Sequence, residues 1–590
     1  MKLKYIALMA VALTVSLSSC KDFLDKETDT RVTLTNVEQL RLLLGTSYMR
    51  ANYANICEIG TDNLIDENSP SDAGVRYNLN SYTRNDDEGF AWEDIRAESG
   101  SDSPSEVWEE AYHAIAGANA VLEEVAEMEA AGNTSDELKA VKGEALVIRA
   151  YHHWLLANVF CMPWRGEQLS QSYPGIPYIT APETKVQVSY QRGTLTETYS
   201  KIERDLLEGL PLINDSYYEV PKYHFNKAAA NAFAARFYLY KREYEKVVQY
   251  ADAAFGGAGV DPAPYMSKLW SNASLRYLSD FGRYYCNTQD QSNFMVLATY
   301  STWWRHFRGY RYLPGREAKR ATIQGPGPTW ANCHYSSQAT GEKFSMHPCF
   351  LNCSFTPGSQ EYGAYFGANV AEQFEYTDKI AGIGYCHIVR REFYGEETLL
   401  CRAEAKLFLG DVDGCLADLK VWDEARRHYT ATDDRMTEFT KASIVNFYTT
   451  AAEKYARNLS RKADLGERYQ DSLYYGIAKP IAIDEVCPSD KYHVTADILP
   501  ILQCIQHFRR IETVHTGLRW FDIKRFGLSL DHYIGRYDKV TLEKLDLRYA
   551  LQIPNEIIAA GLEDNNRYHE KKPKESDPAA STSVQPYYGK

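Results

Sequence analysis

The segment 106–160 constrains the fold of this chain most, because it carries two apolar stripes at helical spacing. Over 106–130 the apolar residues recur every three or four positions, on one face of a helix: Val107, Ala111, Ala114, Ile115, Ala118, Leu122 and Val125. Gly132 ends this helix, and Ser135 is a suitable N-cap for a second helix over 136–160. Two long helices joined by so short a loop pack antiparallel, so the sequence predicts a helical hairpin.

The same periodicity predicts two further helix pairs, at 227–240 with 243–255 and at 395–409 with 411–427. Small residues coincide when the pairs are aligned, as at Ala235 and Ala403. The pairs resemble tetratricopeptide helix-turn-helix units, although the chain lacks a continuous repeat of roughly 34 residues. The predicted fold class is therefore mainly all-α: a scaffold of tetratricopeptide-like helix pairs with long irregular loops.

The stretch 260–393 separates these helix pairs and is rich in Gly, Pro and aromatic residues, with little periodicity. Irregular segments of this length inside a compact protein usually carry function. The end of the chain is rich in Lys, Pro and Ser and is predicted to be mobile. We expect four parts, of which the middle two form one compact unit over 20–570: a signal peptide (1–19), a helical N-terminal part (20–260), a loop-rich and C-terminal part (261–570) and a mobile tail (571–590).

The N-terminal residues predict export and a lipid anchor. Lys2 and Lys4 precede an apolar run over 6–17, which is too short to span a bilayer and has the length of a secretory signal. The run ends in Leu17-Ser18-Ser19-Cys20, which resembles the lipobox of bacterial lipoproteins. We expect cleavage before Cys20 and acylation of its thiol, so that lipid alone holds the protein at the membrane. The alternative is an ordinary signal peptide with a chance cysteine near its end.

Charge and cysteine spacing exclude other classes of protein. The net charge is −14, whereas nucleic-acid binding needs clustered Lys and Arg, so no nucleic-acid partner is expected. The other eleven cysteines of the twelve show no C-x-x-C spacing, so no metal site is predicted. The closest pair, Cys349 and Cys353, is compatible with a local disulfide in an exported protein or with two free thiols.

The sequence carries no enzyme signature: it has no nucleophile elbow, no phosphate-binding loop and no zinc-protease motif. We therefore predict no catalytic residue and no cofactor. Asp411-Val412-Asp413-Gly414 begins like a calcium loop, but its twelfth position is Trp422, so a turn between helices is the simpler interpretation. His152-His153 lies within a predicted helix and is interpreted as packing. Acidic pairs such as Asp86-Asp87 keep a surface hydrolase as a weak alternative.

Aromatic residues give the strongest indication of a binding site. Tyrosine, with 44 residues, is twice as common as phenylalanine, with 22, and tyrosine suits exposed contact surfaces. Aromatic residues interleaved with arginine gather from position 303 onward, beside the turn Gly325-Pro326-Gly327-Pro328. Flat rings pack on the apolar faces of sugars, and polar side chains bind the hydroxyls. The candidate ligand contacts are Trp303, Trp304, Tyr310, Trp330 and Tyr335; the alternative is that the segment is a buried aromatic strand.

Several motifs, in this order, resemble the RagB/SusD family of bacterial lipoproteins. They are Cys20-Lys21-Asp22-Phe23-Leu24-Asp25, Trp108 with Tyr112 and Asn119, Gly143-Glu144-Ala145 with Arg149-Ala150-Tyr151, Asn158-Val159-Phe160, Gly517-Leu518-Arg519-Trp520-Phe521-Asp522 and Ile553-Pro554-Asn555-Glu556-Ile557. In the helix predicted near the C-terminus, Arg519, Asp522 and Arg525 follow at i, i+3 and i+6 and can form ion pairs. That spacing indicates a structural role.

The resemblance implies a SusD-like helical scaffold with long decorated loops. Such proteins lie on the outer face of the outer membrane as lids over a TonB-dependent transporter of the SusC type. They capture glycans, or in some cases peptides, for import, and they are not enzymes. The expected partners are therefore this transporter and an oligo- or polysaccharide. The alternatives are a peptide-binding or purely protein-interaction lid and, more weakly, the hydrolase.

Overall fold

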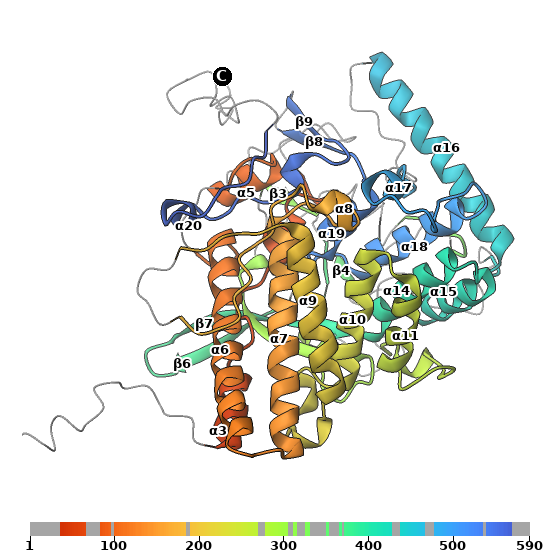
Figure 1. Ribbon diagram of the computed structural model, residues 1–590. Coiled ribbons are helices and arrows are strands. Elements are labelled where there is room, and N and C mark those ends of the chain that lie inside the picture. Colours follow the sequence, from red (N-terminus) through yellow and green to blue (C-terminus); the bar gives the residue numbers. More distant parts are fainter. Residues whose placement is uncertain are drawn as a thin grey trace, which may run out of the picture.

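The computed structural model describes residues 36–66, 83–95, 100–183, 189–268, 278–304, 311–314, 322, 325–330, 350–352, 365–367, 371–426, 437–465, 477–534 and 538–568. The chain is mainly helical, as predicted (Figure 1). The longer helices are α3 (Val37–Gly45), α6 (Pro104–Ala130), α7 (Asp136–Phe160), α9 (Leu195–Gly209), α10 (Lys227–Lys241), α11 (Tyr244–Ala254), α12 (Leu278–Tyr285), α14 (Gly395–Phe408), α15 (Val412–Arg426), α16 (Lys441–Leu465), α18 (Leu499–Glu512) and α19 (Leu518–Phe526).

The remaining elements are short helices and four small antiparallel sheets. The short helices are α4 (Ala54–Glu58), α5 (Arg84–Phe90), α8 (Glu167–Ser170), α17 (Ile483–Val486) and α20 (Asn555–Ala559). The strands are β1 (Ile65–Asp66), β2 (Asn293–Tyr300), β3 (Tyr312–Leu313), β4 (Phe350–Asn352), β5 (Tyr365–Gly367), β6 (Glu372–Asp378), β7 (Ile383–Tyr394), β8 (Leu530–Ile534) and β9 (Asp538–Leu542). Among the described residues, no helix is both long and apolar enough to span a membrane.

The predicted hairpin over 106–160 is confirmed as α6 and α7, which stand side by side in Figure 1. The hydroxyl of Ser103 accepts a hydrogen bond from the backbone N–H of Glu106 and so caps α6. Ser135 caps α7 in the same way, through the N–H of Leu138. Between the two helices, Gly132 takes a φ of +94°, which is a conformation that favours glycine.

The C-terminal end of α7 is completed by residues more than 350 positions later in the chain. The ammonium group of Lys524 donates to the carbonyls of Asn158 and Cys161, at 2.7 Å each. The side chain of Asn565 donates to the carbonyl of Phe160 at 2.8 Å, and the backbone N–H of Leu551 donates to that of Val159 at 3.1 Å. The last carbonyls of a helix have no partner within the helix, so these contacts satisfy them.

Helix α7 packs on α9 through two glycines, Gly143 and Gly209. A Cβ at Gly143 would lie 2.7 Å from the Cβ of Leu212 and 2.9 Å from the carbonyl oxygen of Gly209. We expect Gly143→Ala to lower the free energy of unfolding by about 1–3 kcal/mol, because the two helices would have to move apart. Urea denaturation measures the change. Gly45→Ala is the control, since a Cβ there meets nothing within 4 Å; equal losses in the two variants would contradict this account.

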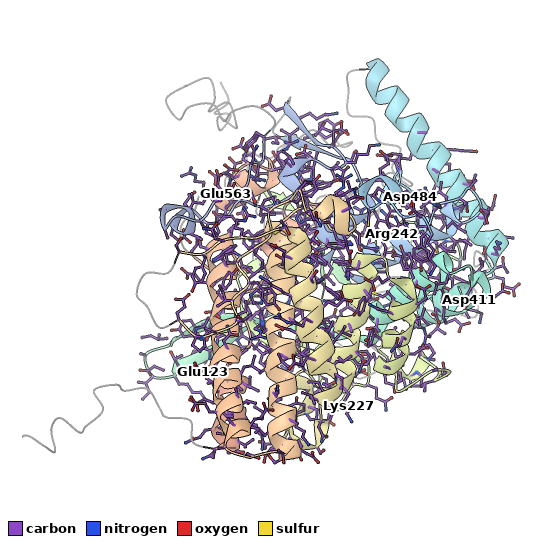
Figure 2. All side chains as sticks on the ribbon, viewed as in Figure 1. Glu123, Lys227, Arg242, Asp411, Asp484 and Glu563 are labelled. Atoms are coloured by element: carbon purple, nitrogen blue, oxygen red, sulfur yellow. The ribbon has the colours of Figure 1, made fainter. Side chains whose placement is uncertain are left out.

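The two later helix pairs are also confirmed, as α10 with α11 and α14 with α15. Helix α11 packs on α14, so the pairs form one continuous helical row. Their tetratricopeptide-like character stays a prediction. Arg242 ends α10 in a left-handed conformation with a φ of +59°, and its guanidinium pairs with Asp484 of α17 at 3.0 Å (Figure 2). This ion pair ties the helical row to the C-terminal part of the chain.

The stretch 260–393 contains a sheet that the sequence did not predict. Strands β2, β7 and β6 form an antiparallel sheet in that spatial order, and β6 with β7 makes a hairpin. The inner end of β7 holds Arg390, Arg391 and Glu392, all of them buried. Because these three charged residues follow one another, the sequence lacks the alternation of polar and apolar residues from which a strand is predicted.

The main hydrophobic cluster draws on residues from Leu40 to Leu562. Buried ion pairs cross it. Arg509 of α18 binds Asp522 of α19 at 2.9 Å, and Arg236 of α10 binds Glu392 at 3.2 Å. The pairing predicted for the C-terminal helix is confirmed for Asp522 and Arg525, at 2.7 Å. These pairs therefore serve the architecture.

Candidate functional site

Trp303 and Trp304, the first two candidate ligand contacts, follow β2 and are buried. Trp303 is 0% exposed, and its indole N–H donates to the carbonyl of His515 at 3.2 Å. Both rings belong to a second, smaller hydrophobic cluster together with Leu64 and Phe90. In this arrangement both indoles stabilise the fold, and a ligand contact by either ring stays a prediction.

Trp330 is buried in a different place. Its indole N–H donates to the carbonyl of Gly325 at 3.0 Å, and its ring packs on Phe508 of α18 with centroids 5.9 Å apart. A Cβ at Gly327 would lie 2.0 Å from the indole, so the Gly/Pro-rich turn needs glycine there. Trp330 belongs to the main cluster, so the structure does not bring it together with Trp303 and Trp304. Cys20, Tyr310, Tyr335, Cys349 and Cys353 lie outside the described residues.

Beside Trp303, four rings from distant parts of the chain stack in a column. Tyr312 packs on Phe90 with centroids 4.5 Å apart, and His532 lies between Phe90 and Trp92, 4.1 Å from each. The ring nitrogens of His532 lie 2.7 and 3.0 Å from the carbonyl oxygens of Phe90 and Thr61. Burial lowers the pKa of His532 to about 4, which keeps the ring neutral at neutral pH. Sequence patterns do not predict this column, because its members come from α5, the residues just after α5, β3 and β8.

Acidic groups next to this column are already paired. The guanidinium of Arg311 donates to both carboxylate oxygens of Asp66, at 2.9 and 2.8 Å. The hydroxyl of Tyr312 donates to Asp87, whose pKa is raised by burial. Asp86 accepts the N–H of Thr83 and closes a capping box at the start of α5. The acidic pair Asp86-Asp87 therefore has structural partners, and its geometry gives no support to hydrolase chemistry.

The histidine pair predicted to pack is confirmed as internal. His152 and His153 are 0% exposed, and each Nδ1 lies 2.8 Å from the carbonyl oxygen four residues earlier. Burial lowers their pKa values to about 4 and about 3. Asp411 accepts the N–H of Gly414, as expected for a turn between helices. Within the described ranges, His, Cys, Asp and Glu form no group of three or more suited to a metal ion.

Several hollows open on the described surface. An apolar one of about 600 Å³ lies between α6, residues 177–183 and 189–190, and α20, and is lined by Trp108, Tyr112 and Tyr190. Burial and the neighbouring Glu183 raise the pKa of Tyr190 to about 12. The second, of about 570 Å³, lies on the sheet β2–β7–β6 and is lined by polar and basic side chains as well. Neither hollow includes a tryptophan of the predicted segment.

The helical N-terminal part of the chain matches a known protein family model. Residues 22–239 match a family model named SusD-like and described as starch-binding and associating with the outer membrane. This match includes α6, α7 and α10 as far as residue 239, and it ends before α11. No curated protein sequence matches the chain significantly.

Solved structures share the fold of nearly the whole chain. A SusD superfamily protein from Bacteroides thetaiotaomicron is 18% identical and has a TM-score of 0.52, and the alignment covers 90% of this chain and 100% of that one. A putative sugar-binding protein from Bacteroides vulgatus is 15% identical and also has a TM-score of 0.52, with 92% and 100% covered. The N-terminal part of the chain is thus similar to the SusD-like family model, and nearly the whole chain has the fold of these solved structures.

Proposed function

We propose that this protein captures glycan at the bacterial cell surface and delivers it to a TonB-dependent transporter of the SusC type. The observation that carries the proposal is the family match over residues 22–239, whose description names starch binding and association with the outer membrane. A structure with the same fold is named a putative sugar-binding protein, which agrees with a glycan ligand. The similarity to the SusD-like family supports delivery to a transporter as part of this proposal.

The lipobox ending in Cys20 supports attachment to the outer membrane by lipid. In this proposal the folded part lies outside the membrane, where polysaccharide is first encountered. The protein acts by binding and has no catalytic activity, which is the general property of SusD-like proteins. A protein can bind a sugar through aromatic rings and polar side chains whose pKa values are ordinary, whereas acid–base catalysis needs side chains with shifted pKa values.

The aromatic segment that begins at Trp303 remains a candidate contact region. Trp303, Trp304 and Trp330 are 0, 7 and 5% exposed and lie in two separate hydrophobic clusters, so they are the weaker candidates for direct contact. Tyr310 and Tyr335 are the proposed direct contacts of this segment. Replacing them with Ala tests this assignment without removing a buried indole.

Affinity electrophoresis of the mature chain, with Cys20→Ala to prevent acylation, tests the proposed function. We expect native-gel migration to be slowed by at least one polysaccharide in a panel of neutral and anionic polymers. Recovery of a transporter in pull-downs, with no polymer retarding the protein, would favour a peptide-binding or protein-interaction lid. Release of shorter sugars from any polymer would instead indicate a hydrolase.

A further inference from the structure

The outer face of the sheet β2–β7–β6 presents a row of side chains to solvent. Residues paired across antiparallel strands point to the same side, so Tyr300, His387 and Gln373 share this face. Ala298 and Val389 form the next pair on it, and Ala298 is exposed. The opposite face carries Ile388, Thr299 and Leu297 into the protein. On the outer side the turn over 221–223 packs against part of β2, while Ala298 and Tyr385 stay exposed.

A hollow of about 570 Å³ lies on this face. Its floor includes Ala298, Val389 and Gln373, and its walls come from the chain after α3, from the turn over 221–223 and from α12. Arg50 and Arg283 are the only charged residues that line it among those described, and both are exposed. Neither guanidinium forms an ion pair within the described part of the chain.

Nearby charges leave the basic character of the hollow in place. Glu110 accepts the backbone N–H of Arg50 at 3.1 Å but is not among the residues that line the hollow. Glu375 lies opposite Tyr385 and points to this same face near the hairpin end, but it does not line the hollow. Lys222, beside the hollow in the turn over 221–223, donates to the carbonyl of Asp290. In a chain with a net charge of −14, a concave surface lined by two unpaired arginines selects an anionic ligand.

Aromatic rings continue this surface on both sides. Tyr300 and Tyr385 lie on neighbouring strands with ring centroids 5.2 Å apart and their planes tilted by 42°. Tyr385 is 54% exposed, and Tyr223, which lines the hollow, is 53% exposed. Exposed rings beside amide, imidazole and guanidinium groups match the apolar faces and polar rims of pyranose rings. The combination suits sugars better than a purely apolar partner.

We propose that the outer face of β2–β7–β6 binds an anionic glycan. The carboxylate or sulfate of the glycan pairs with Arg50 and Arg283, and its sugar rings pack on Tyr223, Tyr300 and Tyr385. Charge-assisted hydrogen bonds to guanidinium are the stronger class, which gives the charged polymer its advantage over a neutral one. This inference rests on the proposed glycan-binding function and adds a place and a ligand class to it.

The sheet itself supplies a matched pair of variants. Tyr385 and Tyr376 are 54 and 53% exposed, but Tyr376 lies opposite Gly384 and therefore points to the other face of the hairpin. We expect Tyr385→Ala to weaken binding roughly tenfold and Tyr376→Ala to leave it unchanged. Both rings are exposed, so neither change should alter the melting temperature. Equal effects of the two substitutions would remove Tyr385 from the site.

The charge requirement is tested with polygalacturonate, chondroitin sulfate, dextran sulfate and, as neutral polymers, methyl-esterified polygalacturonate and dextran. We expect isothermal titration to show tighter binding of a charged polymer, and Arg50→Gln with Arg283→Gln to weaken it roughly 10- to 100-fold. Preference for polygalacturonate or for dextran sulfate distinguishes a carboxylate from a sulfate ligand. Lys420→Gln, an exposed cation on α15, controls for the loss of charge.

Two failures are distinguishable. Binding of neutral polymers alone, or charged-polymer binding that is unchanged in the arginine variant, overturns this site and leaves the glycan-binding function standing. If the wild-type protein binds no polysaccharide in the electrophoretic panel, the proposed function fails and this inference fails with it.

Discussion

Replacing Asp62 with Asn is expected to lower the free energy of unfolding by about 3–5 kcal/mol, one of the two largest losses we predict for a single substitution. Asp62 follows α4 and is only 11% exposed. Its carboxylate accepts two hydrogen bonds from Arg519 at 2.9 Å and one from Lys479 at 2.7 Å, and it lies 3.4 Å from Arg510. An amide of the same shape leaves three cations without their shared negative charge.

The loss at Asp62 should depend on pH in a defined way. Burial alone would raise the pKa of Asp62, but Arg510, Arg519 and Lys479 hold it well below the ordinary value. A lowered carboxyl pKa stabilises the fold above the unfolded pKa of about 3.9, and this contribution fades as the pH falls further. The difference between wild type and Asp62→Asn should therefore be largest at about pH 5–6 and narrow below about pH 4. It should also narrow toward about pH 8, because burial lowers the pKa of Lys479 to about 8 and the loss of Asp62 lowers that pKa further.

Chemical denaturation at several pH values measures this difference. Asp136→Asn is the matched control, because Asp136 is 79% exposed and pairs only with Lys139. Exposed ion pairs contribute about 0–1 kcal/mol, so the control should change little. A loss at Asp62 no larger than that of the control would show that the three cations are stable without it.

Arg426→Met should destabilise the fold on the same scale, about 3–5 kcal/mol. Arg426 is 1% exposed and lies between two carboxylates. It donates to both oxygens of Glu512 at 2.8 Å and lies 2.9 Å from Glu396. Without the guanidinium, Glu512 retains the indole N–H of Trp422, while Glu396 retains Arg391.

The pH dependence of the Arg426 variant has the opposite direction. Burial raises the pKa of Glu512, and removing its cation raises that pKa further. A raised carboxyl pKa costs stability above the unfolded value of about 4.3, so the defect grows with pH and is relieved in acid as the carboxyl takes up a proton. Denaturation at about pH 8 and pH 5 should show the larger loss at pH 8. Lys420→Met, which removes an exposed pair with Glu424, should change stability by at most about 1 kcal/mol at either pH.

The sequence predicted the helices well because their determinants are local. Caps such as Ser135, stops such as Gly132 and the apolar spacing of 106–160 act within a few residues, and α6 and α7 begin and end close to the predicted positions. The sheet was missed because Arg390 and Arg391 are buried in β7, where the distant side chains of Asn52 and Asn293 accept their hydrogen bonds. Such partners are invisible to periodicity.

The candidate site shows the same limit. Aromatic composition identified Trp303, Trp304 and Trp330, but composition does not distinguish an exposed ring from one that fills a core. The exposed tyrosines of the hairpin, Tyr376 and Tyr385, are separated by a turn and carry no motif of their own. Only the strand register shows that they face opposite sides and that Tyr385 lies beside Tyr300.

The hydrogen bonds from Lys524, Leu551 and Asn565 to the last carbonyls of α7 limit the order in which the chain can fold. Residues of α6 and α7 leave the ribosome long before these partners are synthesised. Until then the last carbonyls of α7 lack these hydrogen-bond donors. Contacts of such high sequence separation form late, since closing a long loop has an entropic cost that only the final contacts offset. A growing chain that cannot finish its core early is therefore expected to stay loosely folded until the residues near its C-terminus are made.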